Sequence, residues 1–288
     1  MNTISLKLSS DAISLLKKTY PNNIIESKNP YVDTEIRLSD AIITIYKSEK
    51  VVFVGEGANY YASLFMTKKI HPEAGSDEVG TGDYFGPICV CAAILKEEDH
   101  DLLTKYRITD SKQLSDDEII KTAPELIKKI EYSLLILKPI QYNDVYRNNN
   151  MVAIKTKMHN QAYINLLHKG YKIPKAAYVD QFVAENIYFK YLINEKEVYH
   201  DLIFETKAES KHPAVACASI IARYAFIKEM EAMEKHYALS FHKGAGEETD
   251  KDAYIFVNKY GLERLKEVAK LHFKNTEKVK ETITKKAS

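Results

Sequence analysis

The stretch Gly75-Ser76-Asp77-Glu78-Val79-Gly80-Thr81-Gly82-Asp83-Tyr84-Phe85-Gly86-Pro87 sets two adjacent carboxylates beside a cluster of glycines. Carboxylates beside glycines place oxygen ligands where the backbone can approach a phosphate or a sugar closely. Neighbouring residues on a regular strand point to opposite faces, so Asp77 and Glu78 can serve one metal site only if the strand ends or distorts there. The glycines permit such a distortion. A solvated acidic loop is the alternative interpretation.

Beyond this stretch, the sequence alternates between strand-like and helix-like patterns. An apolar run over residues 87–95 predicts a buried strand. Pro213 occupies the favoured first position of a long helix that is expected to run from about His212 to Tyr237. Because strands alternate with helices, the sequence predicts an α/β domain with a layered sheet. The other expected elements are strands at 132–137, 176–179 and 202–204, and helices at 115–130, 151–168, 182–193 and beyond Asp250.

Two further acids follow predicted strands. Asp180 comes directly after the apolar run 176–179, and open α/β sheets bind ligands at the carboxyl ends of their strands. The alternative role for Asp180 is the N-cap of the next helix. Glu209 follows the predicted strand at 202–204, and its alternative role is to favour a helix start through the helix dipole. Hard oxygen ligands of this kind suit Mg²⁺ or Mn²⁺. Two such ions can hold both the attacking and the leaving oxygens of an in-line phosphoryl displacement.

The first 70 residues have a different organisation. Ser9 and Ser10 are good helix caps, and strand-like runs follow at residues 31–38, 41–46 and 51–54. A second helical run covers residues 58–65. This pattern predicts a small sheet with helices on one face, which divides the chain into domains at residues 1–70 and 71–288. The stretch that contains Lys68, Lys69, Pro72 and Gly75 is a candidate linker.

Composition and charge restrict the class of protein. Hydrophobic residues make up 45% of the chain and charged residues 28%, as in ordinary globular proteins. The net charge of +1 gives no indication of a polyanionic partner. A protein that is nearly neutral overall can still have a basic groove beside an acidic site. The odd, low count of cysteines argues against a disulfide framework and for a reducing compartment. Cys89 and Cys91 lie two apart in an apolar run and are predicted core residues, and a metal site that combines them with Cys217 is the alternative. The sequence contains no membrane span or signal peptide, so a cytoplasmic location is expected.

Several separated motifs resemble ribonuclease HIII, in the order that this family has them. The stretch 75–87 closely resembles the family's opening motif, and the likeness extends to about residue 276. The other matching segments are Thr109-Asp110-Ser111-Lys112-Gln113-Leu114, Lys207-Ala208-Glu209, Val215-Ala216-Cys217-Ala218-Ser219-Ile220-Ile221-Ala222-Arg223 and Lys270-Leu271-His272-Phe273-Lys274-Asn275-Thr276.

The resemblance implies a ribonuclease H-like fold, with a central mixed sheet flanked by helices, and a site of four carboxylates that holds two Mg²⁺ or Mn²⁺ ions. By motif matching, the catalytic and metal-binding acids are Asp77, Glu78, Asp180 and Glu209. The related ribonuclease HII group typically carries Asp at the position of Glu209. Ribonuclease HIII proteins also carry a small α+β domain that resembles the TATA-binding protein and binds the substrate, and residues 1–70 have its position and length.

The resemblance also implies a substrate, which is an RNA/DNA hybrid whose RNA strand is cut to leave 3′-hydroxyl and 5′-phosphate ends. The backbone of Gly80, Thr81 and Gly82 is expected to contact ribose 2′-hydroxyls, which distinguish RNA from DNA. Lys112 and Lys207 are candidates for phosphate contacts, and a solvated surface charge is the alternative for each. No obligate protein partner is indicated.

Two other functions stay open on the sequence. One is a ribonuclease HII-type enzyme that cuts at single ribonucleotides embedded in DNA, and the other is a catalytically silent hybrid-binding protein. The presence of all four acids argues against silence. Ribonuclease HII-like proteins typically have Gly-Arg-Gly at residues 80–82, and a tyrosine in the segment 242–246 that packs on the sugar at the RNA–DNA junction. This chain has Thr81 and Ala245 there, which favours cleavage within runs of ribonucleotides. His272 is expected to be structural rather than a general base.

Overall fold

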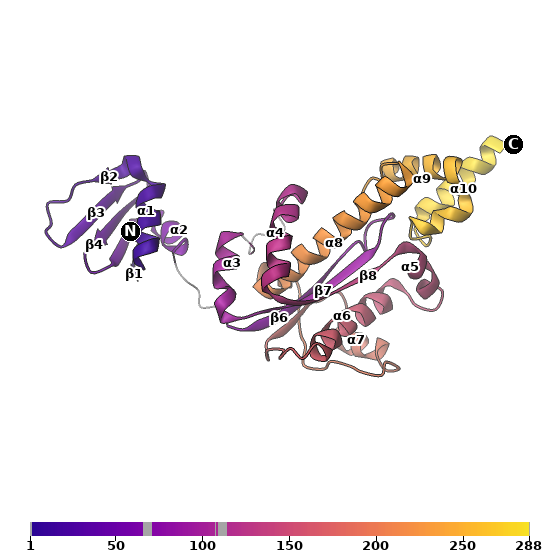
Figure 1. Cartoon of the computed structure of the whole chain (residues 1–288), viewed down its shortest axis with the longest axis horizontal. Helices are drawn as coiled ribbons and strands as arrows, with labels where there is room; N and C mark the ends of the chain where they lie inside the picture. The colour runs from indigo at the N-terminus through magenta and orange to yellow at the C-terminus, as the bar shows by residue number, and fades with distance from the viewer. Residues whose placement is uncertain (1, 66–70, 107, 109–113, 288) are drawn as a thin grey trace. The chain divides into compact units, whose positions relative to one another are not determined.

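The computed structural model describes residues 2–65, 71–106, 108 and 114–287. The chain divides into two compact units, Met1–Lys69 and Ile70–Ser288 (Figure 1). Within the described ranges, no helix is both long and apolar enough to cross a lipid bilayer.

The first unit is an antiparallel sheet with two helices on one face. The described strands follow the order β1-β5-β4-β3-β2. Alternate residues of β3 and β4 are buried, so Ile36 and Ile43 face the helices together with Phe53 of β5. Leu16 of α1 and Ala62 of α2 pack against them. The elements are β1 (Asn2–Lys7), α1 (Ser10–Thr19), β2 (Ile24–Ile25), β3 (Val32–Arg37), β4 (Ala41–Tyr46), β5 (Lys50–Gly55) and α2 (Ala58–Ser63).

Most elements of this unit agree with the sequence pattern. Ser9 is the N-cap of α1, and its hydroxyl accepts a hydrogen bond from the N–H of Ala12. The pattern missed β1 and β2. Strand β1 lies at the edge of the sheet and has no fully buried residue, and β2 has only two residues, so neither leaves a strong apolar signal.

The second unit is built on a mixed sheet with the strand order β10-β9-β6-β7-β8. Strand β6 pairs in parallel with β9 and antiparallel with β7. All eight residues of β7 are buried, because helices cover both faces of the sheet. This arrangement confirms the predicted α/β domain with a central mixed sheet flanked by helices. The strands are β6 (Glu73–Val79), β7 (Ile88–Leu95), β8 (Glu131–Leu137), β9 (Ala177–Asp180) and β10 (Ile203–Glu205).

Two helical layers enclose this sheet (Figure 1). Helix α8 packs on β6 and β7, with α4 beside it, and α6 packs on the other face against β7 and β8. Cys89 and Cys91 of β7 are free and buried in the core, which confirms their predicted role, and Cys217 of α8 is free and buried beside them. The helices are α3 (His100–Lys105), α4 (Asp116–Lys129), α5 (Pro139–Tyr146), α6 (Met151–His168), α7 (Glu185–Tyr191), α8 (Pro213–Tyr237), α9 (Glu247–Tyr260) and α10 (Lys274–Ala287).

Gly75 allows α8 to lie directly on β6. A Cβ atom at this position would overlap the backbone nitrogen of Val215. Glu73, at the start of the same strand, accepts a hydrogen bond of 2.7 Å from the N–H of Ala214 at the start of α8. The sheet and the N-terminal end of α8 are therefore fixed to each other at two neighbouring points.

Strand β6 is the main element that the sequence pattern did not predict. It begins at Glu73, so the candidate linker cannot extend to Gly75, while Lys68 and Lys69 lie outside the described residues. At the acidic pair the strand is regular and not distorted, and it ends one residue later, at Val79. Asp77 pairs with Cys91 and Glu78 with Val90 in regular antiparallel register. The short helices α3 and α5 were not predicted either.

Candidate active site

The register between β6 and β9 brings Asp77 and Asp180 together. Ala74 pairs with Ala177, and the parallel ladder ends at Ser76 and Val179. One step further along the two strands lie Asp77 and Asp180. Because residues in register on parallel strands point to the same face, both carboxylates face α8 at the carboxyl ends of their strands.

Asp77 is held in a site that disfavours its charge. Part of the Asp77 surface is accessible to solvent, but its carboxyl is surrounded by protein atoms. Burial and the nearby charge of Glu78 raise its pKa to about 8, and the charge of Asp180 adds to this effect. Two hydrogen bonds, from Ser219 of α8 and from the backbone N–H of Glu78, act in the opposite direction. A bound cation would relieve this unfavourable position.

Asp180 connects the end of β9 to the turn that precedes α8. Its Oδ1 accepts a hydrogen bond of 2.9 Å from the N–H of Ala208. The alternative role of Asp180 as a helix cap is wrong, because the N-cap of α7 is Ala184. The turn is possible because Lys207 adopts a left-handed conformation, with φ of 55°. The Lys207 side chain is exposed.

Glu209 lies in the short helical turn η4 (Ala208–Ser210), ahead of Pro213 at the start of α8. Its 6% exposure is low for a carboxylate. Because the preceding residue bonds to Asp180, the backbone of Glu209 lies next to the Asp77–Asp180 pair. Glu209 therefore belongs to the turn before the helix and not to the first turn of α8 itself.

Glu78 leaves β6 on the opposite face, toward α6. Its Oε2 lies 2.9 Å from Nε2 of His159, and its Oε1 forms an ion pair with Nζ of Lys155. Burial opposes the charge of Glu78, but the hydrogen bond and charge of His159, together with Lys155, outweigh it and hold the pKa of Glu78 at about 2. The adjacent acids thus lie on opposite faces of the sheet in opposite electrostatic environments.

The chemistry of these side chains fits a hard divalent cation. The donors are carboxylate oxygens, which Mg²⁺ and Mn²⁺ prefer, and the site holds a buried carboxyl whose ionised form lacks a compensating charge. Among the residues that the structure describes, no three His, Cys, Asp or Glu side chains already converge closely enough to hold an ion. Glu78 in particular is engaged by His159 and Lys155 on the far face.

The glycine-rich loop after β6 is fixed by the C-terminal part of the chain. Gly80 has a φ of 99°, and a Cβ atom there would overlap the carbonyl oxygen of Pro87. Asp83 accepts a hydrogen bond of 2.6 Å from the N–H of Gly244, and the buried Lys270 donates one of 2.6 Å to the carbonyl of Gly86. Gly82 is exposed, with open space where a side chain would be. The loop can therefore bring its backbone close to a bound molecule.

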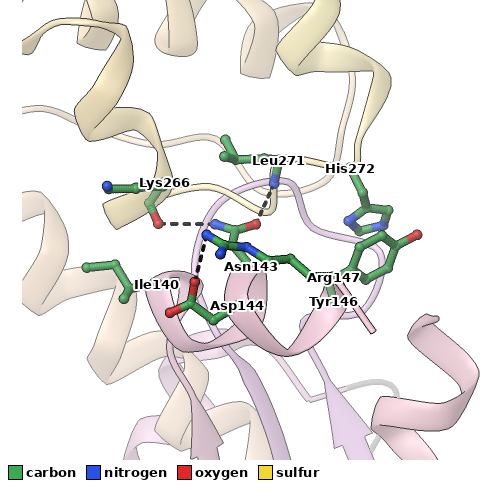
Figure 2. Close-up of a pocket in the computed structure, with 8 residues that line it drawn as sticks. All are labelled: Ile140, Asn143, Asp144, Tyr146, Arg147, Lys266, Leu271 and His272. Carbon is green, nitrogen blue, oxygen red and sulfur yellow. Dashed lines mark hydrogen bonds and ion pairs between the residues drawn. The ribbon is translucent and has the colours of Figure 1, made fainter. Parts of the chain in front are cut away.

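A separate pocket of about 360 Å³ lies between α5 and the segment 266–272 (Figure 2). The side chain of Asn143 lines it and bonds to the backbone of Lys266, Ala269 and Leu271. His272 stacks on Tyr146, with 4.3 Å between the ring centroids. Burial and the charge of Lys270 lower the pKa of His272. None of the four predicted acids lines this pocket.

Sequence reasoning missed four residues that contact or position the site. They are Lys155, His159, Ser219 and Lys270. Lys155 and His159 lie one helical turn apart on α6, and this spacing of two polar residues on one helix face is the signal that could have indicated them. Lys112, predicted to contact phosphate, lies outside the described residues.

The chain is similar to known proteins over nearly its whole length. The family model described as Ribonuclease HII matches residues 74–276, and one described as Domain of unknown function (DUF3378) matches residues 3–77. A ribonuclease HIII of Streptococcus pneumoniae (strain CGSP14) is 39% identical over 289 residues, which cover 97% of this chain and 99% of the relative. The crystal structure of Bst-RNase HIII in complex with Mn²⁺ has a TM-score of 0.72 and 30% identity, and covers 99% of this chain and 100% of that one. Aquifex aeolicus RNase H3 has a TM-score of 0.57 and 25% identity, covering 93% of this chain and 99% of that one.

The mixed sheet, with acids at the ends of β6 and β9, and the match over residues 74–276 define a metal-dependent endoribonuclease of the ribonuclease HII class. The similarity to ribonuclease HIII extends over nearly the full length of the chain and so includes the N-terminal unit, which narrows the family assignment further. The chain belongs to the ribonuclease HIII family. Enzymes of this family depend on Mg²⁺ or Mn²⁺.

Proposed function

We propose that Asp77, Glu78, Asp180 and Glu209 form the site at which this enzyme hydrolyses the RNA strand of an RNA/DNA hybrid. The observation that carries the proposal is the pair Asp77 and Asp180, which lie in register at the ends of two parallel strands, with the pKa of Asp77 raised to about 8. Carboxylates that repel one another in the protein alone are well suited to bind divalent cations.

When bound, two Mg²⁺ or Mn²⁺ ions supply activation of the attacking water and stabilisation of the departing 3′-oxygen. Asp77 and Asp180 would hold them from the α8 face, with Glu209 from the neighbouring turn and Glu78 from the end of β6. Ser219 and the N–H of Ala208 orient the two aspartates through their hydrogen bonds. Hydrolysis in this direction leaves a 3′-hydroxyl and a 5′-phosphate.

The loop and turn beside the acids are proposed to position the RNA strand. The backbone of Gly80, Thr81 and Gly82 would contact ribose 2′-hydroxyls, which is supported by the fixed loop and the open space at Gly82. Lys207 would contact a backbone phosphate, because its exposed ammonium extends from the turn between Asp180 and Glu209. Lys112 is proposed as a second phosphate contact, and the support for it is its place in the matching segment 109–114.

The N-terminal domain, residues 1–70, is proposed to resemble the TATA-binding protein and to bind the hybrid. Support comes from its sheet, which α1 and α2 cover on one face only. The other face presents Lys7 at one edge, Ile42 in the centre and Arg37. Lys7 and Arg37 supply positive charge suited to contacts with a phosphate backbone, although Arg37 also pairs with Glu35.

We infer a cytoplasmic location and no obligate protein partner. The three cysteines are all free and buried, which suits a reducing compartment.

The experiment that tests this function is a cleavage map on three labelled substrates: a full hybrid, a DNA duplex with one ribonucleotide, and double-stranded RNA. Metal-dependent cleavage within the RNA strand of the hybrid is expected, with poor cleavage at the single ribonucleotide. Ala245 has no ring to pack on a sugar at an RNA–DNA junction, and a lost ring stack costs on the order of 1–3 kcal/mol. Incision at the single ribonucleotide as fast as in full hybrid would instead support a ribonuclease HII-type enzyme. Hybrid binding without cleavage would support a silent binding protein.

A further inference from the structure

A buried network connects β6 to α6 on the face opposite the Asp77–Asp180 pair. Ser76 and Glu78 are two residues apart on β6, so they share this face. His159 of α6 is fully buried between them, with Nδ1 2.8 Å from Oγ of Ser76 and Nε2 2.9 Å from Oε2 of Glu78. Lys155, one turn earlier on α6, pairs with the other oxygen of Glu78.

The orientation of the His159 ring is fixed from both ends. A carboxylate oxygen only accepts hydrogen bonds, so Nε2 of His159 carries the proton that it donates to Glu78. Ser76 holds the opposite nitrogen of the ring. Phe182, two residues after Asp180, packs 5.4 Å from the His159 ring and 4.0 Å from the Lys155 ammonium, measured to ring centroids. Each group that contacts Glu78 is therefore itself held in place.

We propose that His159 is a positioning residue, whose Nε2–H together with Lys155 fixes the Glu78 carboxylate at the end of β6 so that it can act with Asp77, Asp180 and Glu209. This inference rests on the proposed four-carboxylate site. Glu78 leaves the strand on the opposite face from Asp77 but near the end of β6, and its charge still acts on Asp77. Contacts that hold the carboxylate there spare it a loss of side-chain entropy when a cation binds. Residues that orient a metal ligand commonly contribute 10–100-fold to metal affinity or activity.

The test is Mn²⁺ binding to the full-length protein without nucleic acid, measured by titration calorimetry, together with kcat and KM for a hybrid. His159→Ala should weaken the Kd for Mn²⁺ by about 10–100-fold. It should also lower kcat and leave KM for the hybrid unchanged, because His159 lies away from the substrate contacts. His159→Gln should restore most of the loss, because its amide can donate to Glu78 from nearly the position of Nε2. Failure of this rescue would contradict a role through that hydrogen bond.

The neighbouring residue provides a matched control. Asn160 is also buried on α6, where it donates a hydrogen bond to the carbonyl of Glu197 and accepts one from the N–H of Tyr199, away from the four acids. Asn160→Ala should lower thermal stability and leave Mn²⁺ affinity unchanged. An equal loss of Mn²⁺ affinity in both variants would show that His159 acts through general stability, which would overturn the proposal.

A variant of Glu78 separates this inference from the proposed function. Glu78→Gln should weaken Mn²⁺ binding, and His159→Ala should then have no further effect in the same chain. Unchanged Mn²⁺ affinity in Glu78→Gln would contradict the four-carboxylate site. A loss in Glu78→Gln but none in His159→Ala would overturn only the role of His159. If His159→Ala does not fold, Lys155→Met removes the other contact to Glu78, and unchanged Mn²⁺ affinity in that variant would overturn the proposal.

Discussion

At the scale of single residues, two neighbouring acids show how the face of a strand on which a carboxyl lies determines the direction of its pKa shift. Asp77 and Glu78 differ by one step along β6, and that step places them under different helices. Asp77 faces Asp180 and has a raised pKa, whereas Glu78 faces two bases and has a lowered one. The ionised form of the first carboxyl is disfavoured in the metal-free protein. The second already has the Lys155 ammonium beside it.

The raised pKa of Asp77 predicts a pH-dependent stability of the metal-free protein. Its pKa is about 8 in the folded chain against a usual 3.8, so the folded state binds this proton more tightly. The contribution of Asp77 is therefore most favourable below pH 4 and is lost as the pH rises from about 4 to about 8. Thermal melts in a chelator should show this loss, and Asp77→Asn should flatten it.

Added Mn²⁺ should raise the melting temperature of the wild type at pH 8, and raise that of Asp77→Asn less. Glu78 does not mask the effect, because its own transition between pH 2 and 4.5 lies below this window. Parallel melting curves for wild type and variant across the pH range would count against a raised pKa at Asp77.

At the scale of elements, the parallel pair β6 and β9 and the contact of β6 with α8 build the site. Asp77 comes from β6, Asp180 from β9, and Glu209 from the turn that leads into α8. Gly75 permits the close contact between β6 and α8. This contact also places Ser219 of α8 within hydrogen-bonding reach of Asp77.

Replacing Gly75 with valine should therefore destabilise the protein. The added side chain would meet the backbone and side chain of Val215, and overpacking of this kind costs about 1–3 kcal/mol. Chemical denaturation should show this loss for Gly75→Val. Gly82→Ala is the matched control, because it has open space around it, and its unfolding midpoint should stay near that of the wild type. Equal midpoints for Gly75→Val and wild type would refute the close packing.

The sequence predicts long elements well and short or irregular ones poorly. Helix α6 was predicted with its observed bounds, Met151–His168, because its helical sequence pattern continues over many residues. Strand β6 was missed because glycine, serine and acids have low strand propensity, and pairing on both sides overrides that preference. His159 was missed because its two partners lie 81 and 83 residues away, and only the fold brings them together.

At the scale of the whole molecule, the proposed function divides affinity and chemistry between the two units. All four candidate acids lie in the second unit, and the first unit contributes a sheet with one open face. The net charge of +1 means that attraction to nucleic acid must come from local groups and not from the total charge.

Removal of Met1–Lys69 should therefore weaken hybrid binding far more than the turnover of bound substrate. The lost contacts are expected to be mainly to phosphates, so the difference in affinity between full-length and truncated protein should shrink as the salt concentration rises. Binding titrations at several salt concentrations and single-turnover cleavage check this. A truncated protein that binds hybrid as tightly as the full chain would refute the assigned role.

The most direct test of the central claim is single-turnover cleavage of a labelled RNA/DNA hybrid by Asp180→Asn. The asparagine keeps the size of the side chain and an oxygen that can accept the hydrogen bond from Ala208, so the fold and hybrid binding should persist. It removes one of the two charges that face each other across β6 and β9. Cleavage in Mg²⁺ or Mn²⁺ should be abolished while the hybrid Kd is unchanged. Near-normal turnover by this variant would contradict the Asp77–Asp180 pair as the catalytic centre.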